Sequence, residues 1–237
     1  IAKSRNAAIK VAKGEYIALI DSDDFWEANK LEESYKHLSQ KKYDGFCHAE
    51  NWLFDDGKKM IVKYGPEEKF SFNTLLTNGN CLSPSATVIK RDVLNEVGGY
   101  SEDEKLITAE DYDLWLKISK KGYKFIFSEK VLGWFRVHSE AESYDIIRNT
   151  NAASNVIKSH FNDSSLNEQE LHKALSNYWR IAGKTCQIRG KYHDSLKMYL
   201  KSNKIKSSFK SYFLIFSLLI PHAIFIPIYN LIKSRKK

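Results

Sequence analysis

The stretch Tyr16-Ile17-Ala18-Leu19-Ile20-Asp21-Ser22-Asp23-Asp24 decides the fold that the sequence predicts. It begins as an apolar run without alternation and ends abruptly in acids. A strand that is apolar on both faces is typical of the centre of a parallel sheet covered by helices. Open α/β sheets bind their ligands just beyond the carboxyl ends of such strands. The acids therefore lie where chemistry is expected, and a solvated acidic turn is the alternative interpretation.

Helical and strand-like segments alternate on both sides of this stretch. The predicted helices span 4–12, 30–39, 91–97 and 111–121, and the predicted strands span 16–20, 46–54, 60–62, 85–89, 123–127 and 131–137. Such alternation predicts an α/β domain with a mostly parallel central sheet flanked by helices. We place this domain at residues 1–140, and a small helical extension, with Gly190 between two helices, at residues 141–207.

The composition excludes several classes of protein. The chain of 237 residues is 43% hydrophobic and 28% charged, which excludes disordered and collagen-like chains. Cys47, Cys81 and Cys186 are odd in number and widely spaced, which favours a reducing compartment over a disulfide framework or a structural zinc site. The net charge of +8 equals the number of basic residues from position 201 onward, where no acid occurs. A neutral body with a basic tail argues against a nucleic-acid partner.

The segment 208–237 is predicted to be a membrane-associating tail. Residues 212–232 are mostly apolar, but Pro221, His222, Pro227 and Asn230 interrupt them, and lysines flank both ends. A spanning helix needs roughly 20 apolar residues and normally a one-sided charge bias. We therefore expect two short helices in the membrane interface, with basic residues on anionic headgroups. A buried C-terminal helix is the alternative.

Several motifs occur in the order that one known family shows. They are Ser4-Arg5-Asn6, Ala12-Lys13-Gly14-Glu15-Tyr16-Ile17, Asp21-Ser22-Asp23-Asp24, Val97-Gly98-Gly99-Tyr100, Glu110-Asp111-Tyr112-Asp113-Leu114-Trp115 and Arg136-Val137-His138. With these motifs, residues 1–140 resemble the family 2 glycosyltransferases of the type A fold, which is nucleotide-diphospho-sugar transferase-like. The resemblance implies inverting transfer of a sugar from a nucleotide-diphosphate sugar, with a UDP-sugar as the favoured donor. It also implies a base-binding strand and helix before Ile1, so we expect this chain to be an N-terminally truncated fragment.

The resemblance implies which residues bind the donor. Asp23 would hold a divalent cation, magnesium or manganese, and His138 would be a further ligand of that ion. Asp21 would contact the ribose or the metal, and Arg5 would lie on the nucleotide side, where a guanidinium suits a diphosphate. A hard cation held by carboxylates offsets the charge of a departing diphosphate. For His138 the alternative is an ordinary surface or core histidine, and we expect Asp24 to cap the segment that follows it.

A second acidic group begins the helix predicted at 111–121. The dipole and free N–H groups of a helix N-terminus favour negative charge, so capping alone is the alternative. Neighbouring helical residues point about 100° apart, so one of Glu110 and Asp111 faces the pocket. By the resemblance, Asp111 is the catalytic base and Glu110 belongs to the nucleotide-sugar site. We expect Asp113 to pack or cap, and by analogy residues 80–85 would line the acceptor region.

The acceptor and the rival functions follow from the remaining features. No Gln-x-x-Arg-Trp stretch follows Asp111, so we expect single-residue transfer rather than polymerisation. The basic tail favours a cell-surface glycan or lipid-linked acceptor at the cytoplasmic, inner face of the cell membrane. One alternative is a non-catalytic membrane-tethered scaffold. The other is an aspartate-nucleophile phosphatase, although that class has Gly and Thr just after its second Asp, where Asp24-Phe25-Trp26 follow here.

Overall fold

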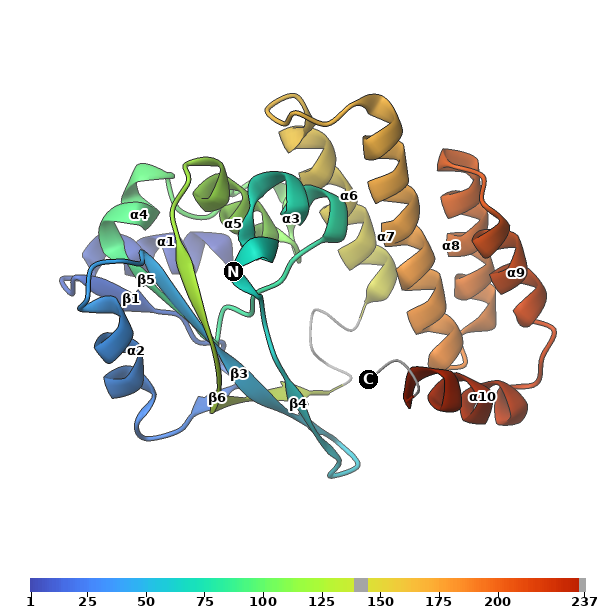
Figure 1. Ribbon diagram of the computed structural model, residues 1–237, viewed down its shortest axis with the longest axis horizontal. Coiled ribbons are helices and arrows are strands. Elements are labelled where there is room, and N and C mark those ends of the chain that lie inside the picture. Colours follow the sequence, from blue (N-terminus) through green and yellow to red (C-terminus); the bar gives the residue numbers. More distant parts are fainter. Residues whose placement is uncertain (139–144, 235–237) are drawn as a thin grey trace.

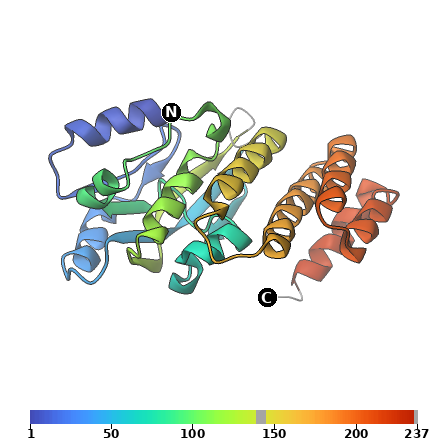
Figure 2. The same cartoon turned by 90° about the horizontal axis from the view of Figure 1, so that it is seen from above.

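The computed structural model describes residues 1–138 and 145–234. Figure 1 shows a twisted sheet with helices on both faces at one end of the molecule and a group of helices at the other end. In the view from above, the C-terminal helices lie beside the α/β part rather than over it (Figure 2). The site described below lies where these two parts meet.

Six strands form one mixed sheet. They are β1 Tyr16–Ala18, β2 Phe25–Trp26, β3 Gly45–Phe54, β4 Lys59–Val62, β5 Thr87–Lys90 and β6 Phe125–Val137. Their order is β1-β5-β3-β6-β2, and β4 pairs with β3 beside this path. The β3–β6 pair is parallel, whereas β1–β5, β3–β5, β3–β4 and β2–β6 are antiparallel.

The predicted α/β architecture with flanking helices is confirmed, but the sheet is mixed and not mostly parallel. Strand β5 lies between β1 and β3 and runs antiparallel to both. Its Val88 and Ile89 are both buried, in cores on opposite faces, because helices cover both sides of the sheet. An apolar run in the sequence therefore indicates that both faces of a strand are buried, but it does not indicate whether the neighbouring strands are parallel or antiparallel. For the same reason the stretch at Tyr16, expected in the centre, lies at an edge of the described sheet.

The two strands predicted at 123–127 and 131–137 form one long strand, β6. Its ladder with β3 changes register between His48 and Glu50, where Ser128 pairs with His48 and Val131 pairs with Ala49. This irregularity explains the break in the sequence pattern. It also bends β6, whose last residues lead directly into His138.

Four of the five α-helices on the α/β part lie close to the predicted positions, whereas α3 was not predicted from the sequence. The α-helices of this part are α1 Ala2–Val11, α2 Lys30–Leu38, α3 Phe72–Asn78, α4 Arg91–Glu96 and α5 Glu110–Lys120, with short 3₁₀ helices at Glu67–Phe70 and Glu104–Leu106. Leu38 of α2 packs with Phe46 on one face of the sheet. Trp115 of α5 packs with Phe125 in the larger core on the other face.

The helical extension joins this larger core directly. Its helices are α6 Ile146–Phe161, α7 Glu168–Ile188 and α8 Tyr192–Ile205. Val156 and Ile157 of α6 are buried in the same cluster as Trp115. Gly190, with φ of +72°, lies in the turn between α7 and α8, as predicted.

Two short helices end the described chain, α9 Phe209–Ser217 and α10 His222–Ser234. Helix α9 lies on the side of α8 that faces away from the sheet, and α10 lies below the ends of α7 and α8 in the same view (Figure 1). Across residues 1–138 and 145–234, every helix is too short or too polar to cross a membrane.

Candidate active site

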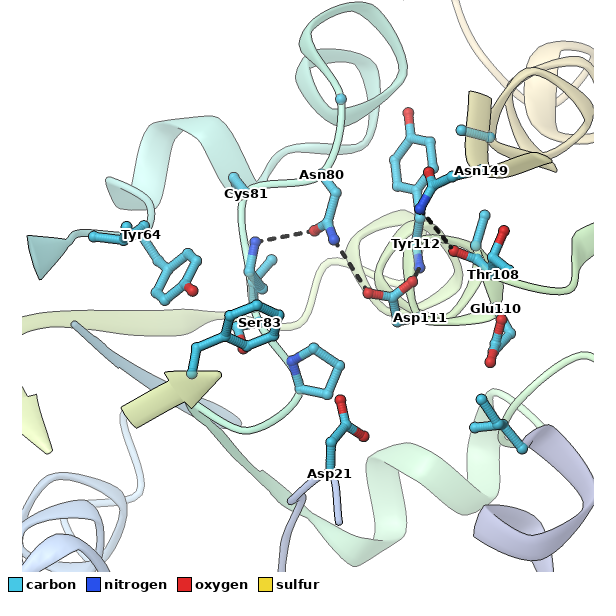
Figure 3. A pocket seen from close by; sticks show the side chains of 18 of the residues that line it. Asp21, Tyr64, Asn80, Cys81, Ser83, Thr108, Glu110, Asp111, Tyr112 and Asn149 are labelled. Carbon is cyan, nitrogen blue, oxygen red and sulfur yellow. Dashed lines mark hydrogen bonds between the residues drawn. The ribbon is translucent and has the colours of Figure 1, made fainter. Parts of the chain in front are cut away.

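A cavity of about 1400 Å³ opens at the end of the sheet where β1 leads into the acidic turn. Its lining comes from α1, the acidic turn, β3, β4, the segment 78–84, the start of α5, the end of β6, α6 and α7. The structure brings all the sequence-predicted site residues to this one cavity: Arg5, Asp21, Asp23, Glu110, Asp111 and His138. Figure 3 shows Asp21 and Asp111 entering it from different elements. The roles of these residues stay predictions.

The acidic turn is held by a serine and an arginine. The backbone N–H of Asp21 donates to Ser85 Oγ at 3.0 Å, and the N–H of Asp24 donates to the Asp21 carbonyl at 3.1 Å. The Arg5 guanidinium pairs with the Asp21 carboxylate. It also lies 5.1 Å from the centre of the Tyr100 ring. In this ion pair the charges of Arg5 and Asp21 offset each other at the wall of the cavity.

Asp23 and His138 meet directly. His138 Nε2 lies 2.9 Å from Asp23 Oδ2, although 115 residues separate them in the chain. Within 1–138 and 145–234, no group of three or more His, Cys, Asp and Glu side chains is arranged to hold a metal ion. One carboxylate and one imidazole nevertheless fit a magnesium or manganese ion, because such ions complete their coordination with phosphate oxygens and water.

Asp24 behaves differently from its two acidic neighbours. It does not cap the following segment as expected, because its Oδ1 accepts a hydrogen bond from the N–H of Arg136 on β6 at 3.0 Å. Its side chain is buried, and this burial raises the pKa of Asp24 to about 6. Asp24 therefore joins the acidic turn to the strand that carries His138 and does not enter the cavity.

Asp111 lies in the first turn of α5 and points toward Asn80 and the middle of the cavity (Figure 3). Asn80 Nδ2 donates to Asp111 Oδ2 at 3.3 Å, and the N–H of Tyr112 donates to Oδ1 at 2.8 Å. Burial, and to a lesser extent the charge of Glu110, raises the pKa of Asp111 to about 6. A carboxylate with such a pKa is ionised at neutral pH and is a better proton acceptor than a solvated aspartate.

Glu110 and Asp113 have separate surroundings on the same helix. Glu110 is buried and points away from Asp111, and its Oε2 has no hydrogen-bond partner among the described residues. Asp113 accepts a hydrogen bond from His160 at 2.8 Å and forms an ion pair with Lys117 at 3.1 Å. Burial would raise the pKa of Asp113, but the His160 hydrogen bond and the Lys117 charge outweigh it and lower the pKa. Asp113 thus packs α5 against α6, as predicted.

A buried lysine beneath the cavity was missed by the sequence analysis. Lys30 is fully buried, its Nζ donates to the Ser85 carbonyl at 2.9 Å, and it lies 3.5 Å from the centre of the Trp26 ring. Burial lowers the pKa of Lys30 to about 7. Trp26 Nε1 donates to the same carbonyl at 2.8 Å. These contacts fix Ser85, which in turn holds the backbone of Asp21.

A buried glutamate lies on the other side of the same segment. Glu50 accepts a hydrogen bond from the Tyr64 hydroxyl at 2.5 Å and one from Ser83 at 3.3 Å. Burial raises the pKa of Glu50 to about 7. Tyr64 and Ser83 both line the cavity. Neither Lys30 nor Glu50 stands in a motif, so no signal in the sequence separates them from surface charges.

Two further walls surround the acidic residues. On the sheet side, the rings of Trp52 and Phe135 lie 4.9 Å apart between centres and form an aromatic surface. On the helical side, Asn149 and Ala153 of α6 and Tyr178 of α7 line the cavity. Gly79 has φ of +91°, and a Cβ there would lie 2.9 Å from the Tyr178 ring, so α7 packs directly on the backbone of the cavity segment.

Residues 1–98, which include α1, the acidic turn and β5, match the family model described as "Glycosyl transferase family 2". This stretch of the chain belongs to glycosyltransferase family 2. The matched region holds Arg5, Asp21 and Asp23. Asp111 and His138 lie beyond it but line the same cavity.

Curated relatives of this chain are glycosyltransferases by name. The UDP-Glc:alpha-D-GlcNAc-diphosphoundecaprenol beta-1,3-glucosyltransferase WfaP of Escherichia coli is 30% identical over 158 residues, which cover 67% of this chain and 60% of the relative. WfgD of Escherichia coli, named for the same reaction, is 35% identical over 50% of this chain and 44% of its own length. The uncharacterized glycosyltransferase MJ1057 of Methanocaldococcus jannaschii is 29% identical over 56% of this chain and 46% of its own length. The chain thus spans about half the length of these relatives.

Solved structures share the fold. S. aureus TarS 1-349 in complex with UDP-GlcNAc aligns with a TM-score of 0.57 at 15% identity, covering 92% of this chain and 64% of TarS. The mannosyltransferase PcManGT of Pyrobaculum calidifontis, in complex with GDP-Man and Mn2+, aligns with a TM-score of 0.53 at 18% identity, covering 95% of this chain and 62% of that protein. At these identities the likeness establishes the nucleotide-sugar transferase-like fold alone.

Proposed function

We propose that the chain carries the catalytic site of an inverting, divalent-cation-dependent glycosyltransferase that moves a sugar from a UDP-sugar to a hydroxyl of a lipid-linked or cell-surface glycan. The observation that carries this proposal is the convergence of Asp111 and the Asp23–His138 pair on one cavity. These groups come from three distant parts of the chain. A solvated acidic turn or a simple helix cap does not require that convergence.

The donor side of the cavity is formed by the acidic turn and α1. Asp23 and His138 would hold the magnesium or manganese ion, which offsets the negative charge of the diphosphate as it leaves. Arg5 and Asp21 would exchange their mutual ion pair for contacts to the nucleotide. UDP is the favoured nucleotide because the names of the Escherichia coli relatives specify UDP-Glc and one TarS structure contains UDP-GlcNAc.

The chemical step is assigned to Asp111. Its carboxylate would take the proton of the acceptor hydroxyl while the hydroxyl oxygen bonds to the anomeric carbon of the donor. The bond between that carbon and the β-phosphate oxygen breaks, and its electron pair leaves with UDP. Attack from the face opposite the departing oxygen inverts the anomeric configuration. General-base help of this kind contributes about 10²–10⁴-fold to the rate.

The acceptor would lie between the aromatic wall and the helical wall. Trp52 and Phe135 offer flat apolar surface for the face of a sugar ring, and Asn149 offers an amide for its hydroxyls. The names of the two Escherichia coli relatives specify a GlcNAc-diphosphoundecaprenol acceptor. For this chain we propose a lipid-linked glycan of the same class, used at the inner face of the cell membrane, with the C-terminal tail in peripheral contact with that membrane.

Binding and product analysis test the proposal together. Calorimetry with UDP, GDP and TDP, each with manganese and with EDTA, is expected to show UDP binding that requires the metal. Incubation with UDP-glucose and a GlcNAc-diphospholipid is expected to release UDP and form a β-linked product, identified by NMR. The variant Asp55→Asn is expected to bind UDP and transfer sugar as the unaltered chain does, because Asp55 is an exposed acid in the β3–β4 turn outside the cavity. Absence of both metal-dependent nucleotide binding and sugar transfer would contradict the proposal and favour a scaffold.

A further inference from the structure

Helix α9 turns its aromatic side chains outward. Phe209, Phe213 and Phe216, at spacings of four and three residues, are 84%, 65% and 69% exposed. This spacing places them on one face of the helix. Leu219, just beyond the helix, is 81% exposed. Large apolar side chains gathered in this way mark an interaction surface.

The inward side of α9 is polar instead. Ser211 and Ser217 are buried, whereas most large apolar residues of the helix are not. Gln187 Nε2 of α7 donates to Ser217 Oγ at 3.1 Å, and Ser211 Oγ lies 2.9 Å from Ser208 Oγ and 3.4 Å from Ser202 Oγ. The fully buried positions of α9 are thus occupied by small hydrogen-bonded side chains.

This arrangement inverts the usual polarity of a helix on a water-soluble domain. In water, a surface helix buries its apolar face and exposes its polar face. Small and polar side chains between helices, with apolar side chains facing outward, are instead typical of helices in contact with lipid. The interior hydrogen bonds also fix which face of α9 points outward, so exposure of the phenylalanines is specified by the fold.

A second cavity, which we name the α9 cavity, lies beside this face. It has a volume of about 410 Å³, and its lining residues are Arg180 and Lys184 of α7 with Phe209, Lys210, Phe213 and Leu214 of α9. Half of these residues are cationic, half are apolar, and none is acidic. Arg180 is oriented by a hydrogen bond to Asn177 at 2.8 Å, and Lys184 lies 4.5 Å from the centre of the Tyr229 ring.

We propose that the α9 cavity binds the phosphate headgroup of an anionic phospholipid in a bilayer, with the phenylalanine face of α9 inserted among the adjoining acyl chains. Three cations around one cavity suit a phosphate, and the apolar half suits the start of an acyl chain. Residues 201–237 contain no acid that would oppose the charge of an anionic bilayer. The inference deepens the membrane contact named under the proposed function and does not depend on sugar transfer.

Flotation with lipid vesicles tests the site. The full chain is expected to bind vesicles that contain phosphatidylglycerol and to bind vesicles of phosphatidylcholine alone much more weakly. Phe213→Ser is expected to weaken binding to both kinds of vesicle by about tenfold, because it removes an aromatic side chain that would be buried in the bilayer. Lys210→Glu is expected to weaken binding by about tenfold on anionic vesicles and to leave binding to neutral vesicles unchanged.

Matched control variants distinguish binding at this site from nonspecific adsorption of the protein to vesicles. Ile61→Ser on β4 and Lys42→Glu in the loop before β3 replace a large apolar residue and a lysine at exposed positions elsewhere, and both variants should bind vesicles as the unaltered chain does. Equal vesicle binding by all four variants and the unaltered chain would overturn the site, as would absence of vesicle binding. If inorganic phosphate raised the melting temperature of the chain only when Lys210 is present, and the chain did not bind vesicles, the ligand would be free phosphate and not a bilayer. Metal-dependent UDP binding should be intact in Phe213→Ser, so failure of the lipid site is distinguishable from failure of the proposed enzyme.

Discussion

Replacement of Asp111 by asparagine tests the assignment on which the chemistry depends. The substitution preserves the size of the side chain, and the remaining amide oxygen can still accept the hydrogen bond from the N–H of Tyr112, while the one from Asn80 is lost. It also removes the charge and the capacity to take a proton. Donor binding should therefore change little while transfer is lost.

The size and pH dependence of the effect follow from the surroundings of Asp111. Loss of a general base lowers the rate by about 10²–10⁴-fold, which corresponds to roughly 3–5 kcal/mol of barrier. Burial raises the pKa of Asp111 to about 6. At pH 5 only about a tenth of the carboxylate is ionised, so transfer by the unaltered chain should fall about tenfold per pH unit below the pKa.

The assay is release of UDP from a UDP-sugar in the presence of a GlcNAc-diphospholipid, measured as kcat and KM from pH 5 to 8. Asp92→Asn is the control, because Asp92 is an exposed aspartate in the first turn of another short helix, α4. The control should keep both the rate and the acidic limb of the profile. An Asp111→Asn variant with more than a tenth of normal kcat, or an acidic limb that persists in that variant, would refute the base assignment.

Three further predictions concern the metal pair and the buried charges. Asp23→Asn and His138→Gln should each weaken manganese-dependent UDP binding by about tenfold or more in calorimetry, and equal affinities in manganese and in EDTA would exclude this role. Asp113→Asn should lower the free energy of unfolding in urea by about 2–4 kcal/mol at pH 7. Because the folded-state pKa of Asp113 is lowered, that difference should shrink as the pH falls below about 4, and a pH-independent difference would contradict the reasoning. Tyr64→Phe leaves Glu50 Oε2 without its donor and should cost about 1–3 kcal/mol of stability, so an unchanged urea midpoint would be the contrary result.

The sequence predicted which acidic residues lie together in the fold better than it predicted the directions of the strands. Asp21, Asp23, Asp111 and His138 stand in short motifs whose order along the chain indicates the family, and they converge in the fold. The direction of β5 had no such signal, because side-chain patterns report which faces are buried and not how strands run.

Buried charges were the residues that sequence reasoning missed at the site. Lys30 stands at the start of a helix among charged neighbours, where a lysine is normally solvated, and Glu50 is a charged residue within a predicted strand. Their burial depends on Ser85, Trp26 and Tyr64, which come from other elements. Such long-range contacts are visible only in three dimensions.

The outward face of α9 shows a related difficulty. The tail was predicted as apolar and basic, which the sequence establishes, but serines in an apolar helix are ordinarily expected to face water. Ser211 and Ser217 face the protein because Ser202, Ser208 and Gln187 provide hydrogen-bond partners there. The direction in which an amphipathic helix points is thus decided by what its neighbours offer.

The packing of Tyr178 on Gly79 has a consequence for chimaeric enzymes. A graft that exchanges α6 and α7 between related chains would replace the helical wall of the cavity, which we propose faces the acceptor, and would leave α1 and the acidic turn unchanged. When a recipient chain has a side chain at the position of Gly79, the loop that contains Gly79 would have to be transferred together with α7. A Cβ at that position would lie 2.9 Å from the Tyr178 ring. If the proposed function holds, such grafts would change the acceptor without changing the nucleotide-sugar donor.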